Sequence, residues 1–324
     1  MKSIQRLFFP LLILFVGCKE STERQIEKET KVPKKATIVQ PTVSFTFDDG
    51  NTSDILDFPF EEWNSRILSH LEKEQLKAVF FVTGRNKLDK KGQFLLESWN
   101  AKGHKIANHS YSHPNFNSPK NTASLFEIEL KKTDAIISKY SNAIPLFRFP
   151  YLKEGQHKTK VDSIRNILAQ NNYTNGYVTI DASDWYVNQR LIGRIKKVGF
   201  KNAEITKYKD FYIGHILERA QYYEKLSYEI NGRHIPHTLL LHHNLTSALF
   251  LGDLIAAFKE KGWNVINAAD AFQDDLFKTS PKSDFAGESL IYALAKQSGK
   301  YQQSLRYPAE DSRYEKDKMS GLGL

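Results

Sequence analysis

The sequence has one cysteine, Cys18, among 324 residues, so an intrachain disulfide is impossible and zinc bound by several cysteines is excluded. It has no internal repeat, and its N-terminal apolar run, residues 7–17, is too short to span a bilayer comfortably. Although the net charge is +9, we find no nucleic-acid motif and no basic cluster interleaved with aromatic residues. Nucleic acid is therefore not an expected partner, and the charge favours membrane surfaces or acidic wall polymers.

The N-terminus has the pattern of an export signal. Lys2 and Arg6 precede the apolar run, as in the charged and hydrophobic regions of a signal peptide. The run ends at Phe15-Val16-Gly17-Cys18, which resembles the lipobox of bacterial lipoproteins, although leucine is more common where Phe15 stands. The resemblance implies a signal peptide at 1–17, lipid attachment to Cys18, and a membrane-anchored lipoprotein in the periplasm or at the cell surface. An ordinary signal peptide or a helical anchor is the alternative.

Three further segments follow the signal. Residues 18–40 are dominated by Lys and Glu without apolar periodicity, which predicts a flexible linker between the membrane and a domain. We expect one large domain at 41–272, because 324 residues suffice for a full core. Residues 273–324 form an extension with a helical stretch at 289–296, which we expect to pack on the domain. We expect a monomer.

From residue 43 short apolar runs alternate with helix-prone stretches. This alternation predicts an α/β fold with a parallel sheet, and about seven units favour a barrel over an open doubly wound sheet, which remains the alternative. Residues 188–236 are basic and Tyr-rich, and we interpret them as an elaborated loop with a helix at 211–230. The expected strands are 43–47, 78–83, 105–108, 146–149, 177–180, 238–241 and 263–267; the expected helices are 61–74, 92–101, 124–139 (with a capping box from Ser124), 158–170 and 247–261.

Two polar motifs follow the first and third expected strands. The first ends in Asp48-Asp49-Gly50, and the third is followed by His109 and His113, four residues apart. Alone, each has a plain explanation, a solvated turn or a surface histidine pair. Together, Asp49 and the two histidines make a His₂Asp set that leaves coordination positions open for water and substrate, as catalytic metal sites do.

Three more motifs follow later strands. They are Arg148-Phe149-Pro150-Tyr151, Asp181-Ala182-Ser183-Asp184-Trp185, and His242-His243 after an apolar strand. A surface ion pair, a helix cap and a core histidine are the respective alternatives. Five polar sites at five strand ends favour an active site, since barrel active sites assemble there.

The ordered set of motifs resembles that of the polysaccharide deacetylase family, the NodB homology or carbohydrate esterase 4 group, over about residues 43–270. The resemblance implies a distorted (β/α)7 barrel, TIM-like, and a divalent metal, zinc or cobalt. It implies metal ligands Asp49, His109 and His113; a general base, Asp48, oriented by Arg148; a general acid, His242, tuned by Asp184; an oxyanion donor in the backbone N–H of Tyr151; and an acetyl pocket lined by Trp185 and Leu240.

One position departs from the family pattern. His243 stands where many members have Asp, but strand alternation sends His242 and His243 to opposite faces, so only one can reach the site. The leucine at 240 fixes the register on His242.

The function implied is metal-dependent hydrolysis of N-acetyl or O-acetyl groups on an extracytoplasmic glycan, such as peptidoglycan or a chitin-like polymer. For N-acetyl groups this is hydrolysis of a linear amide. The alternatives are an acetylxylan-type esterase, a cytosolic C–N hydrolase, against which the export signal argues, and a non-catalytic, metal-retaining glycan-binding protein. The presence of Asp48 and His242 argues against the last.

Overall fold

The computed structural model describes Pro10 and residues 39–306 and 311–324. The expected signal peptide, Cys18 and nearly all of the expected linker lie outside these residues. Residues 38–324 group into one unit by their contacts. In the part of the chain that the structure describes, no helix combines the length and apolar character needed to cross a membrane.

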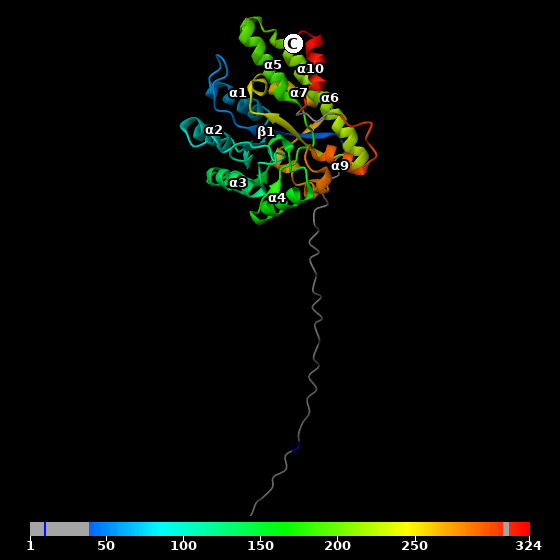
Figure 1. Cartoon of the computed structure of the whole chain (residues 1–324). Helices are drawn as coiled ribbons and strands as arrows, with labels where there is room; N and C mark the ends of the chain where they lie inside the picture. The colour runs from blue at the N-terminus through cyan, green and yellow to red at the C-terminus, as the bar shows by residue number, and fades with distance from the viewer. Residues whose placement is uncertain (1–9, 11–38, 307–310) are drawn as a thin grey trace, which may run out of the picture. The chain divides into compact units, whose positions relative to one another are not determined.

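A parallel sheet centred on β1 (Thr42–Asp49) organises this unit (Figure 1). One edge of β1 pairs with β6 (Pro236–His242), and the other edge pairs first with β7 (Asn264–Val265) and then with β2 (Val79–Val82). The sheet continues through β3 (Lys105–Asn108), β4 (Ala143–Phe147) and β5 (Thr174–Asn175). Because the strands are parallel, their carboxyl ends lie at one edge, with Asp48 opposite His242.

The sheet curls so that the chain after β5 meets β6. Ile180 forms an isolated parallel bridge with Leu239, and the Leu240 N–H donates to the Ile180 carbonyl at 3.1 Å. The fold class expected from the sequence, a barrel-like α/β fold, is confirmed. The fifth expected strand is wrong in detail, because 177–180 contributes only this bridge and the strand lies at 174–175. At Gly176 a Cβ would lie 2.4 Å from the Phe81 ring, so the chain crosses the sheet here too closely for an ordinary ladder.

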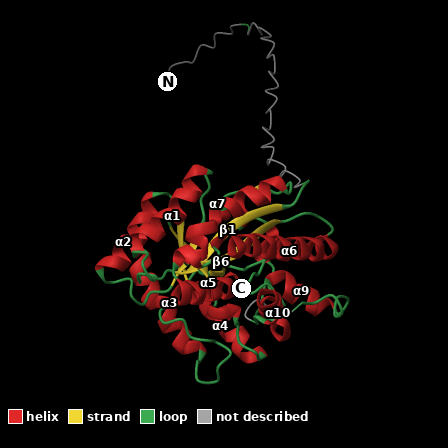
Figure 2. Cartoon of the chain, turned by 90° about the horizontal axis from the view of Figure 1, so that it is seen from above, coloured by secondary structure: helices red, strands yellow, loops and turns green. Residues whose placement is uncertain are grey.

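Helices surround the strands, as Figure 2 shows from above. The expected helix starting at Ser124 begins instead at Ala123, because the Thr122 hydroxyl accepts the Leu125 N–H and caps it. The helices are α1 (Phe60–Lys73), α2 (Lys90–Ala101), α3 (Ala123–Ile137), α4 (Lys158–Gln170), α5 (Asp184–Val198), α6 (Ile205–Asn231), α7 (Leu245–Glu260), α8 (Ala268–Ala271), α9 (Leu290–Ser298) and α10 (Arg313–Gly321), with 3₁₀ turns at Pro150–Leu152, Phe200–Asn202, Asp275–Lys278 and Ser283–Phe285.

The region expected to be a loop with one helix contains two helices, α5 and α6. The expectation was wrong at α5, whose apolar side, Val187, Leu191 and Ile195, recurs every four residues and is buried. In α6 the tyrosines explain the composition of the region. Tyr208, Tyr212 and Tyr223 bury their rings together with aliphatic residues such as Ile216 and Leu226, so this long helix packs through both kinds of side chain.

The C-terminal extension packs on α6. Its helix α9 matches the expected helical stretch, whereas α10 was not predicted. Lys318 of α10 pairs with Glu218 of α6 at 3.0 Å, and the guanidinium of Arg306 lies 4.6 Å from the ring centroid of Tyr222. Arg306 and Lys318 of the extension therefore contact α6.

Candidate active site

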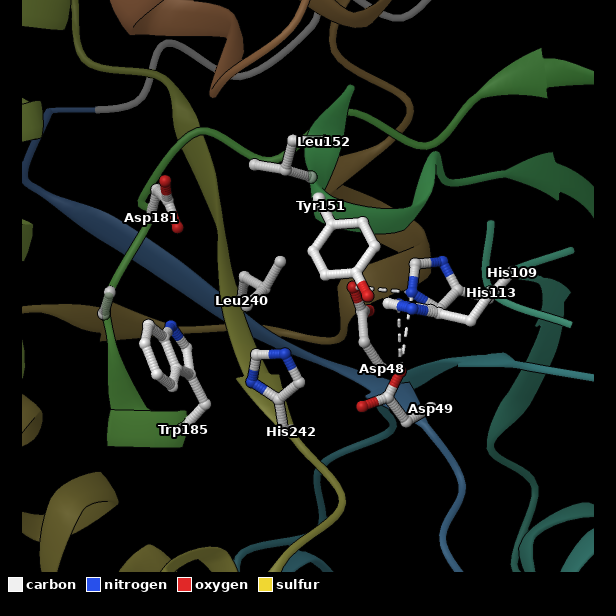
Figure 3. A pocket seen from close by; sticks show the side chains of 11 residues that line it. Asp48, Asp49, His109, His113, Tyr151, Leu152, Asp181, Trp185, Leu240 and His242 are labelled. Carbon is white, nitrogen blue, oxygen red and sulfur yellow. Dashed lines mark ion pairs between the residues drawn. The ribbon is translucent and has the colours of Figure 1, made fainter. Parts of the chain in front are cut away.

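Polar side chains converge on one pocket at the carboxyl edge of the sheet (Figure 3). The pocket has a volume of about 300 Å³. It brings together residues from the ends of β1 and β6, from the segments that follow β3, β4 and β5, and from the start of α5. Its lining is Asp48, Asp49, His109, His113, Tyr151, Leu152, Asp181, Ala182, Trp185, Leu240 and His242.

The two aspartates at the end of β1 have different surroundings. The Asp48 side chain is buried, while that of Asp49 is 42% exposed. The backbone turns immediately, with φ of 80° at both Asp49 and Gly50, a conformation that suits glycine. At Gly50 a Cβ would also lie 3.0 Å from Lys87, so a side chain there would crowd the turn that aims the carboxylates.

Arg148 holds Asp48 in place. Its Nη1 donates to Asp48 Oδ1 at 2.6 Å and to the Thr46 hydroxyl at 2.9 Å, and its Nε donates to the Gly176 carbonyl at 2.9 Å. The guanidinium also lies 3.8 Å from the ring centroid of Phe81. Because Oδ1 is engaged, Oδ2 is the Asp48 oxygen left to face the pocket, 3.7 Å from His109 Nε2.

Asp49, His109 and His113 form a group that could hold a metal ion. One ligand atom from each lies within 4.8 Å of the others. Asp49 Oδ1 is 3.7 Å from His109 Nε2 and 3.4 Å from His113 Nε2. Two imidazoles and one carboxylate suit zinc or cobalt, and three protein ligands leave positions open.

The protonation states in this group suit metal binding. His109 Nδ1 lies 2.8 Å from the Arg148 carbonyl and must donate to it, which directs Nε2 toward the pocket as the ring atom that can bind a metal. Burial and the neighbouring His109 lower the pKa of His113 to about 4, so this imidazole is neutral near pH 7. Burial disfavours the charge on Asp49, but attraction to the His242 imidazolium, the largest opposing effect, lowers its pKa.

The loop that carries the histidines is fixed by Glu129 of α3. This buried carboxylate accepts the backbone N–H groups of Tyr111 and Ser112, at 2.9 Å and 2.6 Å, and the Ser112 hydroxyl. The loop needs such support, because His113 has a left-handed φ of 59°. Sequence reasoning missed Glu129, which stands 16 residues after His113 in the middle of a helix.

On the opposite side of the pocket, His242 pairs with Asp184. Asp184 Oδ1 lies 2.6 Å from His242 Nδ1, and Oδ2 accepts the His242 backbone N–H at 2.9 Å. Asn244 Nδ2 donates to the same Oδ2 at 3.0 Å. Burial alone would lower the pKa of His242, but the Asp184 carboxylate outweighs it and raises the pKa to about 10. The imidazolium is therefore the form present at neutral pH, with Nε2 as its remaining donor.

His243 has no place in the pocket. Its Nε2 lies 3.0 Å from Asn64 Oδ1, and its ring packs among the side chains of Trp63 and Phe80. Burial lowers its pKa well below the usual value, so it is a neutral core residue. Strand alternation correctly separated it from His242.

The remaining walls include expected and unexpected residues. Tyr151, Trp185 and Leu240 line the pocket as the motifs suggested, and the Tyr151 ring meets His113 with centroids 4.5 Å apart. Leu152 was not predicted to line it, and Asp181, although part of one of the strand-end motifs, had been given no role. Asp181 directly follows the expected strand 177–180, and that position was its only sequence signal.

Comparison with known proteins finds a similarity within the first part of the chain. Residues 35–176 match the polysaccharide deacetylase family. Over 144 residues the chain is 29% identical to a peptidoglycan-N-acetylglucosamine deacetylase of Bacillus cereus, covering 44% of this chain and 46% of the relative. Over 186 residues it is 27% identical to one of Listeria monocytogenes, covering 57% of this chain and 35% of the relative. The chain thus spans less than half the length of each relative.

Solved structures share the fold. A carbohydrate esterase family 4 pseudoenzyme from Bacillus anthracis superposes with a TM-score of 0.51 at 20% identity, over 72% of this chain and 66% of the other. A mutant of it described as having restored enzymatic activity gives the same TM-score over 72% and 68%. At this identity the likeness shows the fold alone.

Proposed function

We propose that this chain, whose residues 35–176 carry a polysaccharide deacetylase domain, is a metal-dependent hydrolase that removes N-acetyl groups from an extracytoplasmic glycan. One observation carries the proposal. A single pocket holds a three-ligand metal group, a carboxylate fixed by an arginine, and a charged histidine fixed by a second carboxylate. These are the parts that amide hydrolysis needs: an electrophile, a base and an acid.

The base is Asp48. Asp49, His109 and His113 would hold the cation, which when bound supplies Lewis-acid polarisation of the acetyl carbonyl and a water of lowered pKa. Asp48 Oδ2, the oxygen that Arg148 leaves free, takes the proton of the attacking water. The Asp48 carboxylate starts in a fixed orientation, so no side chain has to reorganise before the proton moves.

The acid is His242. Amide cleavage requires a proton on the departing nitrogen, because an amide anion is a very poor leaving group. His242 is protonated at neutral pH through Asp184 and can give that proton from Nε2. The pair therefore stands on the side of the pocket where the leaving amine would depart.

The walls suit a small acyl group. Leu240 is buried and Trp185 lines the same pocket, so an acetyl methyl would meet apolar surface there. The N–H of Tyr151 is our proposed donor to the oxyanion, at a turn with a left-handed φ of 57°.

Two finer parts of the proposal concern substrate and location. Both relatives are named for N-acetylglucosamine in peptidoglycan, which favours an amide over an ester substrate and peptidoglycan over chitin or xylan. The sequence 1–18 supports export and a lipid anchor at Cys18, which would hold the enzyme at a membrane near such a polymer.

The test is acetate release by the purified protein from peptidoglycan, N-acetylglucosamine oligomers and acetylated xylan, with chelator and with added zinc or cobalt. We expect metal-dependent acetate, with the amide substrates ahead of xylan. No acetate from any of them by protein that is shown to contain metal would refute the proposed activity.

The second candidate is a metal-retaining glycan-binding protein. It is disfavoured because Asp48 and His242 are both present with their partners. Glycan binding without acetate release, by metal-loaded protein, would establish it.

A further inference from the structure

A second cleft adjoins the proposed active site. It has a volume of about 280 Å³ and shares Asp49 and His113 with the catalytic pocket. We call it the cationic cleft and define it by Asn51, Thr52, Arg85, Asn86, Lys87 and Ser112, which line it beyond the shared residues. A glycan whose acetylated sugar sits over the metal ligands would place a neighbouring sugar in this cleft.

Lys87 gives the cleft a buried positive charge. Its side chain is buried, with 2% of the residue exposed, and its Nζ donates to the Arg85 carbonyl at 3.3 Å. Among the described residues it makes no ion pair. Burial lowers its pKa to about 8, against the attraction of Asp49 and Asp89, so the ammonium is charged at neutral pH. Burying an ammonium without a bonded carboxylate costs free energy. This cost points to a ligand that supplies the missing negative charge.

The protein makes room for this lysine. A Cβ at Gly92 would lie 2.4 Å from the Lys87 Cα, and one at Gly50 would lie 3.0 Å from its Cε. The loop is fixed further by Asp89, whose carboxylate accepts the Gly92 N–H at 2.7 Å and caps α2. The ammonium is therefore preorganised instead of sampling many rotamers in solvent.

The rest of the cleft fits a sugar with a negative group. Arg85 is exposed at its rim and adds a second positive charge, while Asn51, Thr52 and Asn86 offer amide and hydroxyl groups for sugar hydroxyls. The Asp49 carboxylate would be bound to the metal, so it would not also neutralise Lys87.

We propose that the cationic cleft binds a carboxylate on the sugar next to the one that is deacetylated. The inference rests on the proposed function and narrows its substrate to an acidic glycan. The carboxylate could be a lactyl ether, as on muramic acid, or a uronic acid. Lys87 is then a specificity-determining residue that acts through charge.

The experiment compares an acid with its own methyl ester, which has nearly the same shape without the charge. The ligands are a tetrasaccharide of alternating N-acetylglucosamine and N-acetylmuramic acid, one of alternating N-acetylglucosamine and glucuronic acid, and the methyl esters of both. Binding to zinc-loaded Asp48→Asn protein is measured by calorimetry, so that turnover does not interfere. We expect at least one acid to bind about tenfold more tightly than its ester.

Three variants of that protein locate the effect. Lys87→Met keeps most of the side-chain length and should remove the difference between acid and ester, whereas Lys87→Arg should retain part of it. Lys90→Met, which removes an exposed lysine at the start of α2, should retain all of it. Thermal unfolding checks that each variant is folded. For each tetrasaccharide we take the ratio of the affinity of the acid to that of its methyl ester. The tetrasaccharide with the larger ratio identifies the source of the carboxylate.

Two outcomes would overturn the inference. Equal binding of acid and ester by the parent protein removes the need for a carboxylate site. An acid preference that survives Lys87→Met places the carboxylate elsewhere, for instance on the metal. Acetate release without any acid preference would refute this inference alone, whereas absence of acetate from every glycan would refute the proposed function and leave the binding data interpretable.

Discussion

The two sides of the catalytic pocket are built in different ways. The metal side, Asp48, Asp49, His109 and His113, comes from the ends of β1 and β3, and its supports are single residues, Arg148 and Glu129. The acid side consists of one pair of side chains, Asp184 at the start of α5 and His242 at the end of β6.

The supports of the acid side reach much further along the chain. Ser183, which precedes Asp184, has its hydroxyl 3.1 Å from His215 Nε2 on α6. The same nitrogen lies 3.3 Å from Glu315 Oε1 on α10, and Glu315 is fully buried. The acid side thus depends on helices that strand-end motifs do not reveal. We therefore expect that a substitution on the metal side impairs metal binding without changing the pKa of His242, and that a substitution on the acid side impairs proton donation without changing metal affinity.

The largest effects are expected on the metal side. His109→Ala should abolish both metal binding and turnover, since it removes a ligand. Asp48→Asn should retain the metal yet lower kcat by about 10²–10⁴-fold, the usual contribution of a general base. Metal content by atomic emission and acetate release give the two readouts. Wild-type rates in Asp48→Asn would show that the base has been misassigned.

Asp184→Asn should affect the acid side alone. It removes the charge that raises the His242 pKa to about 10. Activity that needs the protonated imidazole is lost as pH rises through that pKa, so the alkaline limb of kcat/KM should move to lower pH. Metal content should remain unchanged, and a limb that stays in place would contradict the assignment of His242.

The same pair predicts a change in stability. A pKa raised in the folded state stabilises the protein fully below the unfolded value, near 6.5, and this stabilisation is lost as pH rises toward about 10. The free energy of unfolding of the metal-free protein, measured by denaturant titration, should therefore contain a falling contribution across that range. Asp184→Asn should remove it, and an unchanged pH profile would contradict the pairing.

Glu129→Ala should weaken metal binding without touching a ligand. It releases the Tyr111 and Ser112 N–H groups that hold the histidine loop. Loss of such an outer partner typically costs about 10–100-fold in metal affinity. Competition with a fluorescent zinc chelator measures this. The His242 titration, followed by NMR, should be unaffected, and a shift there would mean that the two sides are coupled.

Glu315→Ala should have the smallest effect of these substitutions. In contrast to Glu129→Ala, it should lower stability and leave metal affinity unchanged. Burial raises the pKa of Glu315, and its removal leaves buried polar groups of His215 and Ser183 less well satisfied. We expect a loss of about 1–3 kcal/mol in the free energy of unfolding. Zinc affinity should match that of the parent protein, and a loss as large as that in Glu129→Ala would break the comparison.

That Asp48, Asp49, His109 and His113 lie together could be predicted from the sequence, for a physical reason. Asp48-Asp49 and His109 with His113 are short local patterns, and parallel strands bring their ends together whatever the helices do. The register of His242 could be predicted in the same way, from alternation along one strand.

The supports could not be predicted because they depend on tertiary packing. Helix α10 has few apolar residues, and its buried Glu315 looks like a solvated charge in the sequence. Asp181 enters the pocket only because the chain after β5 crosses to β6 as a bridge. The polar sequence of α10 and the irregular path at Asp181 give no periodic signal.

Arg148 performs two tasks with two chemically different parts. Its backbone carbonyl orients His109, and any amino acid would supply that carbonyl, whereas its guanidinium orients Asp48, which only arginine can do in this geometry. A single codon change at this position would therefore detach the base and leave the metal histidine aligned. Under the proposed function, such a protein would keep its three candidate metal ligands but lose the oriented base, so one substitution would separate a hydrolase from a metal-retaining binding protein.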